Sequence, residues 1–569
     1  MMDTEKIFCS ILMDVMAAHG VRDVVCSPGT RNAPLLIAVA ARKEFKTHVV
    51  IDERSAAFMA LGMATVSRKP VMLICTSGTA LLNYSPAVAE AFYQSVPLIV
   101  VSADRPGQWI DQDDSQTLRQ FEALSNFVKK SYEMPSSGED DAEMRWFANR
   151  ICNDAAIEAL SGRQGPVHIN FPLGGDLGKK REKIDSKERI IDILSAEGFV
   201  NKEIIKELAR EMAGKKVMFV AGFMPPSARM NRAVAELCAL PNVVPFCETL
   251  SNLHIGNRAT DVDAVLTAYH RKDLETYAPD LIISVGGALV SRMLKEYLRN
   301  NRATAEHWTV GFQRTTVDCF MSLTKRIETE PARFIHQLAK AAGKYVDTRV
   351  SSYAAEWSEL RCGAEKIKSE YVEQVGWSEL RAFRVILSSL TDRVNLFLSN
   401  GTTVRYAQIS GCYSAHASYC NRGVSGIDGS ASTAVGGAIA YGKETVLITG
   451  DMSMAYDVNA LSLPEVPDGM KIIVIDNRGG GIFRFISTTS GLEEREQYFC
   501  ASPRLPLRHL AEGYGWHYDE ASSEEELSEK LPAFLRYPSK GILKVSCPPE
   551  YSAEVLKNYF RAKDISKDL

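Results

Sequence analysis

Two polar side chains stand directly after apolar runs in the last third of the sequence: Asp451 ends ETVLITGD and Asn477 ends MKIIVIDN. Each run has the pattern of a buried parallel strand, and parallel sheets bind ligands at the carboxyl ends of their strands. Three glycines, 479–481, follow Asn477 and let the backbone approach a ligand closely. A carboxylate, an amide oxygen and the carbonyl of Gly479 are hard oxygen ligands of the kind that Mg²⁺ takes, often together with phosphate and water. Either half alone is more simply a turn or a strand end, but the two together predict a metal and diphosphate site.

A short helix is expected after Asp451, with Ser453 and Asp457 in its first turns and its free N–H groups facing a phosphate. The stretch 450–477 resembles the diphosphate-binding motif of thiamine diphosphate (ThDP) enzymes, a Gly-Asp-Gly that is followed, after an intervening segment, by Asn-Asn. Met452 and Asp476 depart from this motif, although the second Asn is the expected ligand. The resemblance implies that Asp451, Asn477 and Gly479 hold Mg²⁺ (or Mn²⁺) against the cofactor's diphosphate. It also implies cofactor contacts from Thr79, Asn400, Gly401, Thr402, Ile427, Gly450, Met452, Ser453, Gly480, Ile482 and Phe483.

Glu53 follows an apolar run and opens an alanine-rich helix in VVIDERSAAFMALGMA. An acid in a first helical turn, behind Asp52 as N-cap, is ordinarily explained by the helix dipole. ThDP chemistry also needs a carboxylate that bonds the aminopyrimidine ring of the cofactor, and the resemblance assigns this catalytic position to Glu53. Because Glu53 and Asp451 lie in different parts of the chain, the cofactor is expected between two domains. In the family these domains belong to different subunits, which implies a homodimer or a homotetramer.

Arginines, rather than histidines, occupy the loops where strands are expected to end. Arg31, Arg105, Arg292, Arg405 and Arg422 all lie in such loops, whereas none of the ten histidines is paired with another or stands beside the motifs above. Arginine stays charged and binds carboxylates bidentately, although each one alone is more often a structural ion-pair residue. Together they predict a pocket for substrates that carry several carboxylates.

Long motifs in family order resemble one ThDP family, 2-succinyl-5-enolpyruvyl-6-hydroxy-3-cyclohexene-1-carboxylate synthase (MenD) of menaquinone biosynthesis. They are SPGTRNAPL, DERSAAF, TSGTALLNYSPAVAEA, SADRP, NRGVSGIDG, GDMSMAYDVNAL and NRGGGIF. The resemblance implies a transferase that decarboxylates 2-oxoglutarate and adds the succinyl-semialdehyde unit 1,4 to isochorismate. It implies substrate contacts from Thr30, Arg31, Arg105, Gln116, Arg292, Arg405, Arg422, Ile482 and Phe483. Ser291 stands where the family commonly has a basic residue and Ser115 where it commonly has asparagine, so the contacts at these two positions stay open.

Other functions stay open beside this one. A different ThDP-dependent 2-oxoacid decarboxylase or carboligase, similar to acetolactate synthase, would share the cofactor motif but needs no arginine set. A non-catalytic ligand sensor with the same fold would be expected to lose Glu53 or Asp451, and both are present. A dinucleotide-binding domain is not indicated, because no G-x-G-x-x-G follows a strand at the required place.

The elements that must position these residues follow from alternation of apolar runs with helical patterns, which is typical of parallel α/β sheets. Strands are expected within 22–28, 47–52, 70–78, 97–106 and 165–172, then 215–223, 242–248, 280–287 and 307–312, then 394–403, 444–451, 470–477 and 541–549. These groups predict three doubly wound parallel-sheet domains of the ThDP-enzyme type: a pyrimidine-binding domain (1–180), a central domain (190–350) and a diphosphate-binding domain (370–569). The first and third groups resemble each other, which indicates duplication.

Composition and charge indicate which classes of partner and which cellular compartment to expect. A net charge of −4 over 569 residues gives no sign of a nucleic-acid surface. The first 20 residues have the pattern of an amphipathic helix with Ile7, Leu12, Val15 and Met16 on one face, and no stretch is apolar for the ~18 residues that a membrane span needs. Twelve scattered cysteines without a C-x-x-C pair favour a reduced, cytoplasmic protein.

Overall fold

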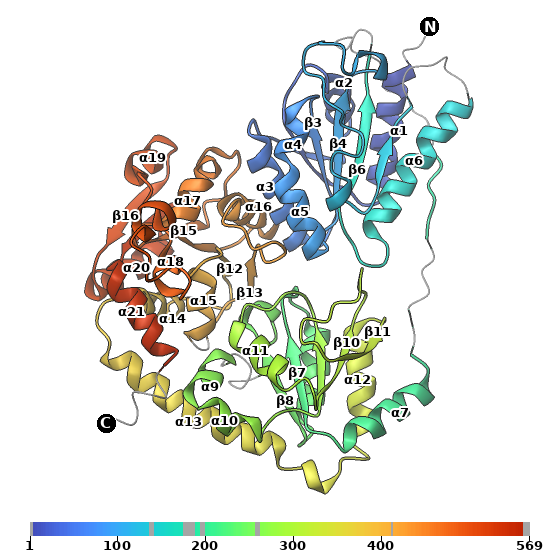
Figure 1. The fold of residues 1–569 in the computed structure, drawn as a ribbon. Coiled ribbons are helices and arrows are strands. Elements are labelled where there is room, and N and C mark those ends of the chain that lie inside the picture. Colours follow the sequence, from blue (N-terminus) through green and yellow to red (C-terminus); the bar gives the residue numbers. More distant parts are fainter. Residues whose placement is uncertain are drawn as a thin grey trace.

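The structure is a computed structural model that describes residues 4–135, 142–174, 188–193, 198, 200–255, 262–410 and 413–561. It contains three α/β domains, each built around one parallel sheet (Figure 1). The fold class predicted from the sequence is thereby confirmed. Among the described residues, no helix is both long and apolar enough to cross a membrane.

The first sheet has six parallel strands in the order β2-β1-β3-β4-β6-β5. Its strands are β1 (Asp23–Cys26), β2 (Lys46–Val49), β3 (Val71–Cys75), β4 (Leu98–Asp104), β5 (Ser131–Glu133) and β6 (Val167–Pro172). The α-helices of this domain are α1 (Thr4–Ala18), α2 (Ala33–Ala40), α3 (Glu53–Ser67), α4 (Thr79–Asn83), α5 (Ser85–Gln94) and α6 (Ala142–Leu160). The predicted N-terminal helix is α1, and its apolar residues are buried in the first domain's core.

The second sheet has five parallel strands in the order β11-β10-β9-β7-β8. Its strands are β7 (Val217–Ala221), β8 (Val243–Cys247), β9 (Leu281–Val285), β10 (Glu306–Val310) and β11 (Leu323–Ile327). The α-helices along this part of the chain are α7 (Lys202–Ala213), α8 (Ala228–Cys238), α9 (Val262–Ala268), α10 (Arg271–Glu275), α11 (Arg292–Asn300) and α12 (Pro331–Ala342). The long helix α13 (Tyr353–Gln374) then leads to the third domain along the lower edge of the molecule in Figure 1.

The third sheet repeats the strand order of the first, as β13-β12-β14-β15-β17-β16. Its strands are β12 (Asn395–Leu398), β13 (Ala417–Cys420), β14 (Thr445–Gly450), β15 (Met470–Asp476), β16 (His517–Ala521) and β17 (Gly541–Ser546). Its α-helices are α14 (Glu379–Ser388), α15 (Thr403–Ile409), α16 (Ser430–Tyr441), α17 (Asp451–Tyr456), α18 (Gly481–Phe485), α19 (Leu507–Gly513), α20 (Glu524–Arg536) and α21 (Pro549–Tyr559).

Helices α3 and α16 join the first domain to the third, and they lie side by side in Figure 1. A Cβ atom at Gly62 would lie 1.9 Å from the carbonyl oxygen of Thr433, and one at Gly436 would lie 1.9 Å from that of Met59. Glycine therefore permits a backbone-to-backbone crossing that no larger residue allows. Buried apolar residues of both domains form one continuous core across this crossing.

Candidate cofactor and substrate site

Asp451 begins α17 directly after the buried strand β14. Its Oδ2 accepts a hydrogen bond of 2.7 Å from the backbone N–H of Gly479, and its Oδ1 accepts one from Met452. Burial, with a smaller contribution from the nearby Asp476, raises the pKa of Asp451 to about 7 against the lowering effect of the Gly479 hydrogen bond. A carboxylate in such surroundings is stabilised as an anion by a neighbouring cation.

Asn477 follows β15 at the same edge of the sheet and is 4% exposed. Its Nδ2 donates to Oε1 of Glu379 over 2.8 Å, whereas its Oδ1 is buried and has no hydrogen-bond partner. Buried polar atoms are nearly always paired, so this oxygen indicates a missing ligand. Within the described residues, no three His, Cys, Asp or Glu side chains are placed to bind a metal. An ion here would therefore be held by Asp451 together with amide and carbonyl oxygens, the donor set that Mg²⁺ prefers.

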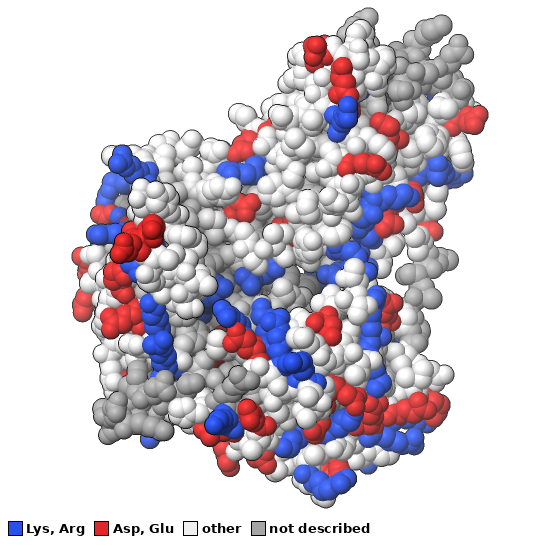
Figure 2. Space-filling view, in the orientation of Figure 1, with Lys and Arg blue, Asp and Glu red and all other residues white. Residues whose placement is uncertain are grey.

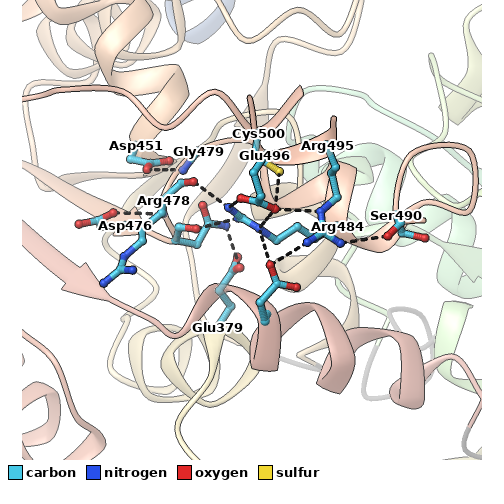
Figure 3. Close-up of polar contacts among 12 residues, drawn as sticks. Glu379, Asp451, Asp476, Arg478, Gly479, Arg484, Ser490, Arg495, Glu496 and Cys500 are labelled. Carbon is cyan, nitrogen blue, oxygen red and sulfur yellow. Dashed lines mark hydrogen bonds and ion pairs between the residues drawn. The ribbon is translucent and has the colours of Figure 1, made fainter. Parts of the chain in front are cut away.

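The loop after Asn477 needs glycine and is tightly held. Gly479 has φ +106°, and a Cβ atom there would lie 2.1 Å from the carbonyl oxygen of Cys500. Arg484, which is 2% exposed, donates to the carbonyl oxygens of Asn477 (2.9 Å) and Arg478 (3.0 Å) and pairs with Glu496 (Figure 3). The main chain that carries the proposed ligands is thus held at fixed positions.

The helix after Asp451 differs in part from the prediction. Ser453 lies within its first turn, and its hydroxyl donates to the carbonyl oxygen of Ile427 over 2.6 Å. The placement of Asp457 in the first turns was wrong, because α17 ends at Tyr456 and Asp457 follows it. The Asp457 carboxylate is buried and accepts hydrogen bonds from the N–H and hydroxyl of Ser432 on α16. Asp457 therefore supports the start of α16 rather than facing a phosphate.

The loop after β12 lies beside this pocket. Thr402 donates its hydroxyl proton to Oε2 of Glu379 over 3.2 Å, so Glu379 contacts both Thr402 and Asn477. The amide of Asn400 is occupied by the carbonyl oxygens of Asn421 and Gly426, both at 2.6 Å. Asn400 accordingly organises the loop that carries Ile427, and it would offer a ligand its backbone rather than its side chain.

Two of the predicted arginines meet at this loop. Arg422 donates to Oδ1 of Asn400 over 2.9 Å, and Arg405 donates to the carbonyl oxygen of Gly401, whose φ is +91°. Burial lowers the pKa of Arg405, and the neighbouring charge of Arg422 lowers it further. Two guanidinium groups this close favour an anion between them. Figure 2 shows Lys and Arg side chains around the central hollow where the three domains meet.

The first domain presents a second group of predicted residues at the carboxyl edge of its own sheet. Arg105 pairs with Asp114 (2.6 Å) and donates to the carbonyl oxygen of Ser115 (3.1 Å). Arg31 donates to the carbonyl oxygen of Leu173, just after β6. Gln116 is exposed with φ +53°. Thr30 and Thr79 are also exposed, and Thr79 begins α4.

Glu53 begins α3, and Asp52 is the N-cap that accepts from the N–H groups of Arg54 and Ser55. The predicted capping role of Asp52 is confirmed. Glu53 is half-buried in the first turn after the loop that follows β2, and its charge adds to the effect of burial in raising the pKa of Cys75. Arg54 donates to the carbonyl oxygen of Tyr456, the last residue of α17, and Asp52 accepts from Asn459 just beyond it, whereas Asp451 begins that helix. Among the described residues, no hydrogen bond or ion pair links Glu53 to Asp451.

Comparison with known proteins agrees with this geometry. Residues 8–123 match the family described as "Thiamine pyrophosphate enzyme, N-terminal TPP binding domain", where thiamine pyrophosphate is another name for ThDP. A 2-succinyl-5-enolpyruvyl-6-hydroxy-3-cyclohexene-1-carboxylate synthase of Porphyromonas gingivalis is 40% identical, over 98% of this chain and 97% of the relative. Synthases of the same name from Flavobacterium psychrophilum and Flavobacterium johnsoniae are 37% and 36% identical, each over 97% of this chain and 98% of the relative. The chain belongs to the MenD family. It is a ThDP-dependent enzyme with a ThDP-binding first domain.

Ser291 departs from the MenD pattern, and its surroundings show why a serine fits. It is buried, its N–H donates to Oε1 of Glu248, and its hydroxyl donates to Asp263 (2.5 Å) while accepting from the N–H of Leu294 as the N-cap of α11. Arg292 differs from the buried Arg422, since its side chain is 79% exposed and pairs with Glu296 on its own helix. The structure therefore does not bring Arg292 together with Arg405 and Arg422.

Lys295 is the basic residue of α11 that reaches this cluster, and sequence reasoning missed it. Its Nζ donates to the carbonyl oxygen of Leu289 over 3.3 Å, and Arg422 donates to the same oxygen over 3.5 Å. The sequence signal was its position one helical turn after Ser291, where the two side chains share a face.

The predicted apolar positions Ile482 and Phe483 lie in α18, next to Gly480, and are half-buried. Phe483 packs against Phe499 with ring centroids 5.8 Å apart. A Cβ atom at Gly480 would lie 2.5 Å from the Phe483 ring, so the ring can occupy this position only because residue 480 is glycine.

Proposed function

We propose that this chain decarboxylates 2-oxoglutarate and adds the resulting succinyl-semialdehyde unit to isochorismate, with ThDP and Mg²⁺ (or Mn²⁺) as cofactors. The printed name of the relatives is that of the product-forming synthase, and the identity extends over nearly the whole chain. The observation that carries the proposal is the unpartnered Asn477 oxygen at the same sheet edge as the buried Asp451 carboxylate, which accepts from the next loop at Gly479.

The predicted site residues fall into groups that would bind the metal, the cofactor's diphosphate and the substrate carboxylates. Asp451, Asn477 and the Gly479 carbonyl would bind the metal, and the start of α17 at Ser453 would lie against the diphosphate. When bound, ThDP supplies the carbon nucleophile and electron sink for decarboxylation. Arg405 and Arg422 would bind substrate carboxylates, and Ile482 with Phe483 would exclude water from their neighbourhood. Arg31 and Arg105 would supply further carboxylate contacts from the first domain.

We further propose a homodimer as the smallest active unit, with Glu53 of one subunit facing Asp451 of the other. Within one chain, the neighbours of Glu53 contact the end of α17 and the residues just after it rather than its start, which supports a second subunit as the source. A dimer-of-dimers tetramer is compatible with the same pairing. The described cysteines form no disulfide with one another, which supports a reducing, cytoplasmic location.

The direct test is an assay of isochorismate consumption with 2-oxoglutarate, ThDP and Mg²⁺. Product formation that requires both substrates supports the proposal. Turnover of pyruvate alone would instead support a carboligase similar to acetolactate synthase. Absence of ThDP binding in calorimetry would support a non-catalytic sensor.

The subunit proposal has its own test, co-expression of Glu53→Gln and Asp451→Asn chains with different tags. If the site spans two subunits, each mixed dimer contains one intact site, and a random mixture recovers about a quarter of parental activity. If one chain supplied both residues, no mixture would regain activity, and the intersubunit site would be refuted.

A further inference from the structure

Glu379 is a buried acid that neither the motif nor the proposed mechanism uses. It begins α14, is 3% exposed, and donates its backbone N–H to Oγ of Ser552 over 3.0 Å. Its carboxylate accepts from the Asn477 amide (2.8 Å) and from the Thr402 hydroxyl (3.2 Å). It therefore connects two loops of the proposed cofactor pocket.

The chemistry of these contacts fixes the direction of the Asn477 amide. An ionised carboxylate only accepts hydrogen bonds, so Asn477 must turn its NH₂ group toward Glu379 and its oxygen the opposite way. That oxygen is the buried atom without a partner. The two ends of an amide have nearly the same shape, and the hydrogen-bond partner decides which end points where.

The main chain of Asn477 is held independently of its side chain. Arg484 binds the carbonyl oxygens of Asn477 and Arg478, and no described hydrogen bond links Arg484 to Glu379 (Figure 3). Fixing the backbone leaves the amide free to rotate by half a turn about its last bond. Only Glu379 among the described partners of this side chain opposes that rotation.

We propose that Glu379 is a positioning residue that presents Oδ1 of Asn477 to the divalent cation. The inference rests on the proposed metal site at Asp451 and Asn477. Partners of metal ligands typically change metal affinity by about 10–100-fold when they are lost. Glutamine at 379 retains an oxygen that accepts from Asn477, and the Thr402 hydroxyl can reverse its role and accept from the new amide. Methionine has a similar length but offers no comparable acceptor.

The test measures Mn²⁺ binding in the presence of ThDP by electron paramagnetic resonance, without turnover. We expect Glu379→Met to weaken Mn²⁺ binding about 10–100-fold and Glu379→Gln to stay within about threefold of the parent. Ser552→Ala is the matched control, since it removes the backbone contact of Glu379 and leaves the carboxylate in place. Unchanged Mn²⁺ binding in Glu379→Met, or equal losses in both variants, would overturn the inference.

A second pair of variants keeps the inference testable if Glu379→Met does not fold. Asn477→Asp places two carboxylates face to face and should weaken Mn²⁺ binding, whereas adding Glu379→Gln supplies an N–H donor and should restore at least about tenfold of the loss. A double variant no better than the single one would refute the positioning role. Asp451→Asn distinguishes failure of the proposed metal site from failure of the positioning role of Glu379. If Asp451→Asn leaves Mn²⁺ binding unchanged, the proposed metal site itself is wrong.

Discussion

The first and third domains have the same parallel strand order but carry different chemistry at corresponding strand ends. Where β14 delivers the buried Asp451, the corresponding β3 leads into Thr76, Ser77 and Gly78. Where β15 delivers Asn477, β4 ends at Asp104 and leads into Arg105. The shared topology determines where ligand loops lie, and the side chains determine which charge each loop binds.

A third pair of corresponding strands, β2 and β13, also differs in the residues that follow each strand. Strand β2 is followed by Glu53 at the start of α3, whereas β13 is followed by a loop that contains Ile427 and leads into α16. The carboxylate of Glu90 on α5 accepts from the N–H groups of Gly423 (2.5 Å) and Val424 (2.7 Å) in that loop. The first domain thus also shapes a loop of the third.

The largest difference between the two domains is expected at Asp451, which has no acidic counterpart after β3. Asp451→Asn keeps the shape of the side chain but removes the charge, and we expect the Mg²⁺-dependent affinity for ThDP to fall at least about 100-fold. Asp476→Asn is the matched control, because Asp476 pairs with Lys544 over 3.0 Å beside the strand end, and its loss should change affinity less than about threefold. Calorimetric titration with ThDP and Mg²⁺ measures both. Equal losses would contradict the ranking of the two acids.

Glu53 should behave differently from Asp451. Glu53→Gln removes a carboxylate that acts on proton transfer, so we expect turnover to fall about 10²–10⁴-fold while ThDP binding and the fold are kept. Steady-state assays, calorimetry and circular dichroism distinguish the three properties. Turnover near that of the parent would remove Glu53 from the mechanism.

The crossing of α3 and α16 tests whether the two domains are one cooperative unit. Gly62→Ala pushes a methyl group against the backbone of Thr433, so the free energy of unfolding should fall by about 1–3 kcal/mol. Gly214→Ala is the control, because no atom lies within 4 Å of its added Cβ and its φ is −96°. Urea unfolding measures both. A loss of similar size in Gly214→Ala would show that the close backbone contact at the α3–α16 crossing is not the cause of the destabilisation.

The smallest expected effect concerns pH. His168, the second residue of β6, is buried beside Ser102 (2.8 Å), whereas the second residue of the corresponding β17 is Ile542. Burial lowers the pKa of His168 to about 4, against about 6.5 in an unfolded chain. Between those values the unfolded state binds the additional proton, so this histidine costs stability progressively as pH falls below about 6.5.

His168→Gln removes that titration. Between about pH 7 and about pH 5, the free energy of unfolding of the variant should fall by about 2 kcal/mol less than that of the parent. Urea unfolding at the two pH values gives the difference for each protein. Identical changes in parent and variant would show that His168 is not held neutral in the folded state.

The central strands were predictable because they are nearly all apolar, as in VMLIC of β3, where every residue is buried. The four strands that the sequence did not reveal, β5, β11, β13 and β16, all lie at sheet edges. Three of them are half-exposed and carry polar residues, as in LTKRI of β11 and HYDEA of β16, so they lack a continuous apolar run. Edge strands bury fewer side chains, and their pattern is correspondingly weak.

The residues of the candidate site likewise include some that could be predicted from the sequence and some that could not. Asp451 and Asn477 could be paired from the sequence because both follow buried strands of one sheet. Glu379 and Arg484 could not, since their roles arise from tertiary contacts and GIFRF gives no sign that its arginine is 2% exposed. Arg292 begins a helix, and its side chain is exposed and pairs with Glu296, so its predicted substrate contact stays a prediction.

The α3–α16 crossing also has a consequence for how the chain is made. At about 5–20 residues per second, a ribosome needs about 20–75 s between synthesising Gly62 and Gly436. During that time the face of α3 that packs on α16 has no partner, and every residue from Ser55 to Ala64 is buried in the finished protein. Closing so long a loop is slow, and exposed apolar surface favours aggregation meanwhile. A nascent first domain should therefore be a substrate for chaperones until the third domain emerges.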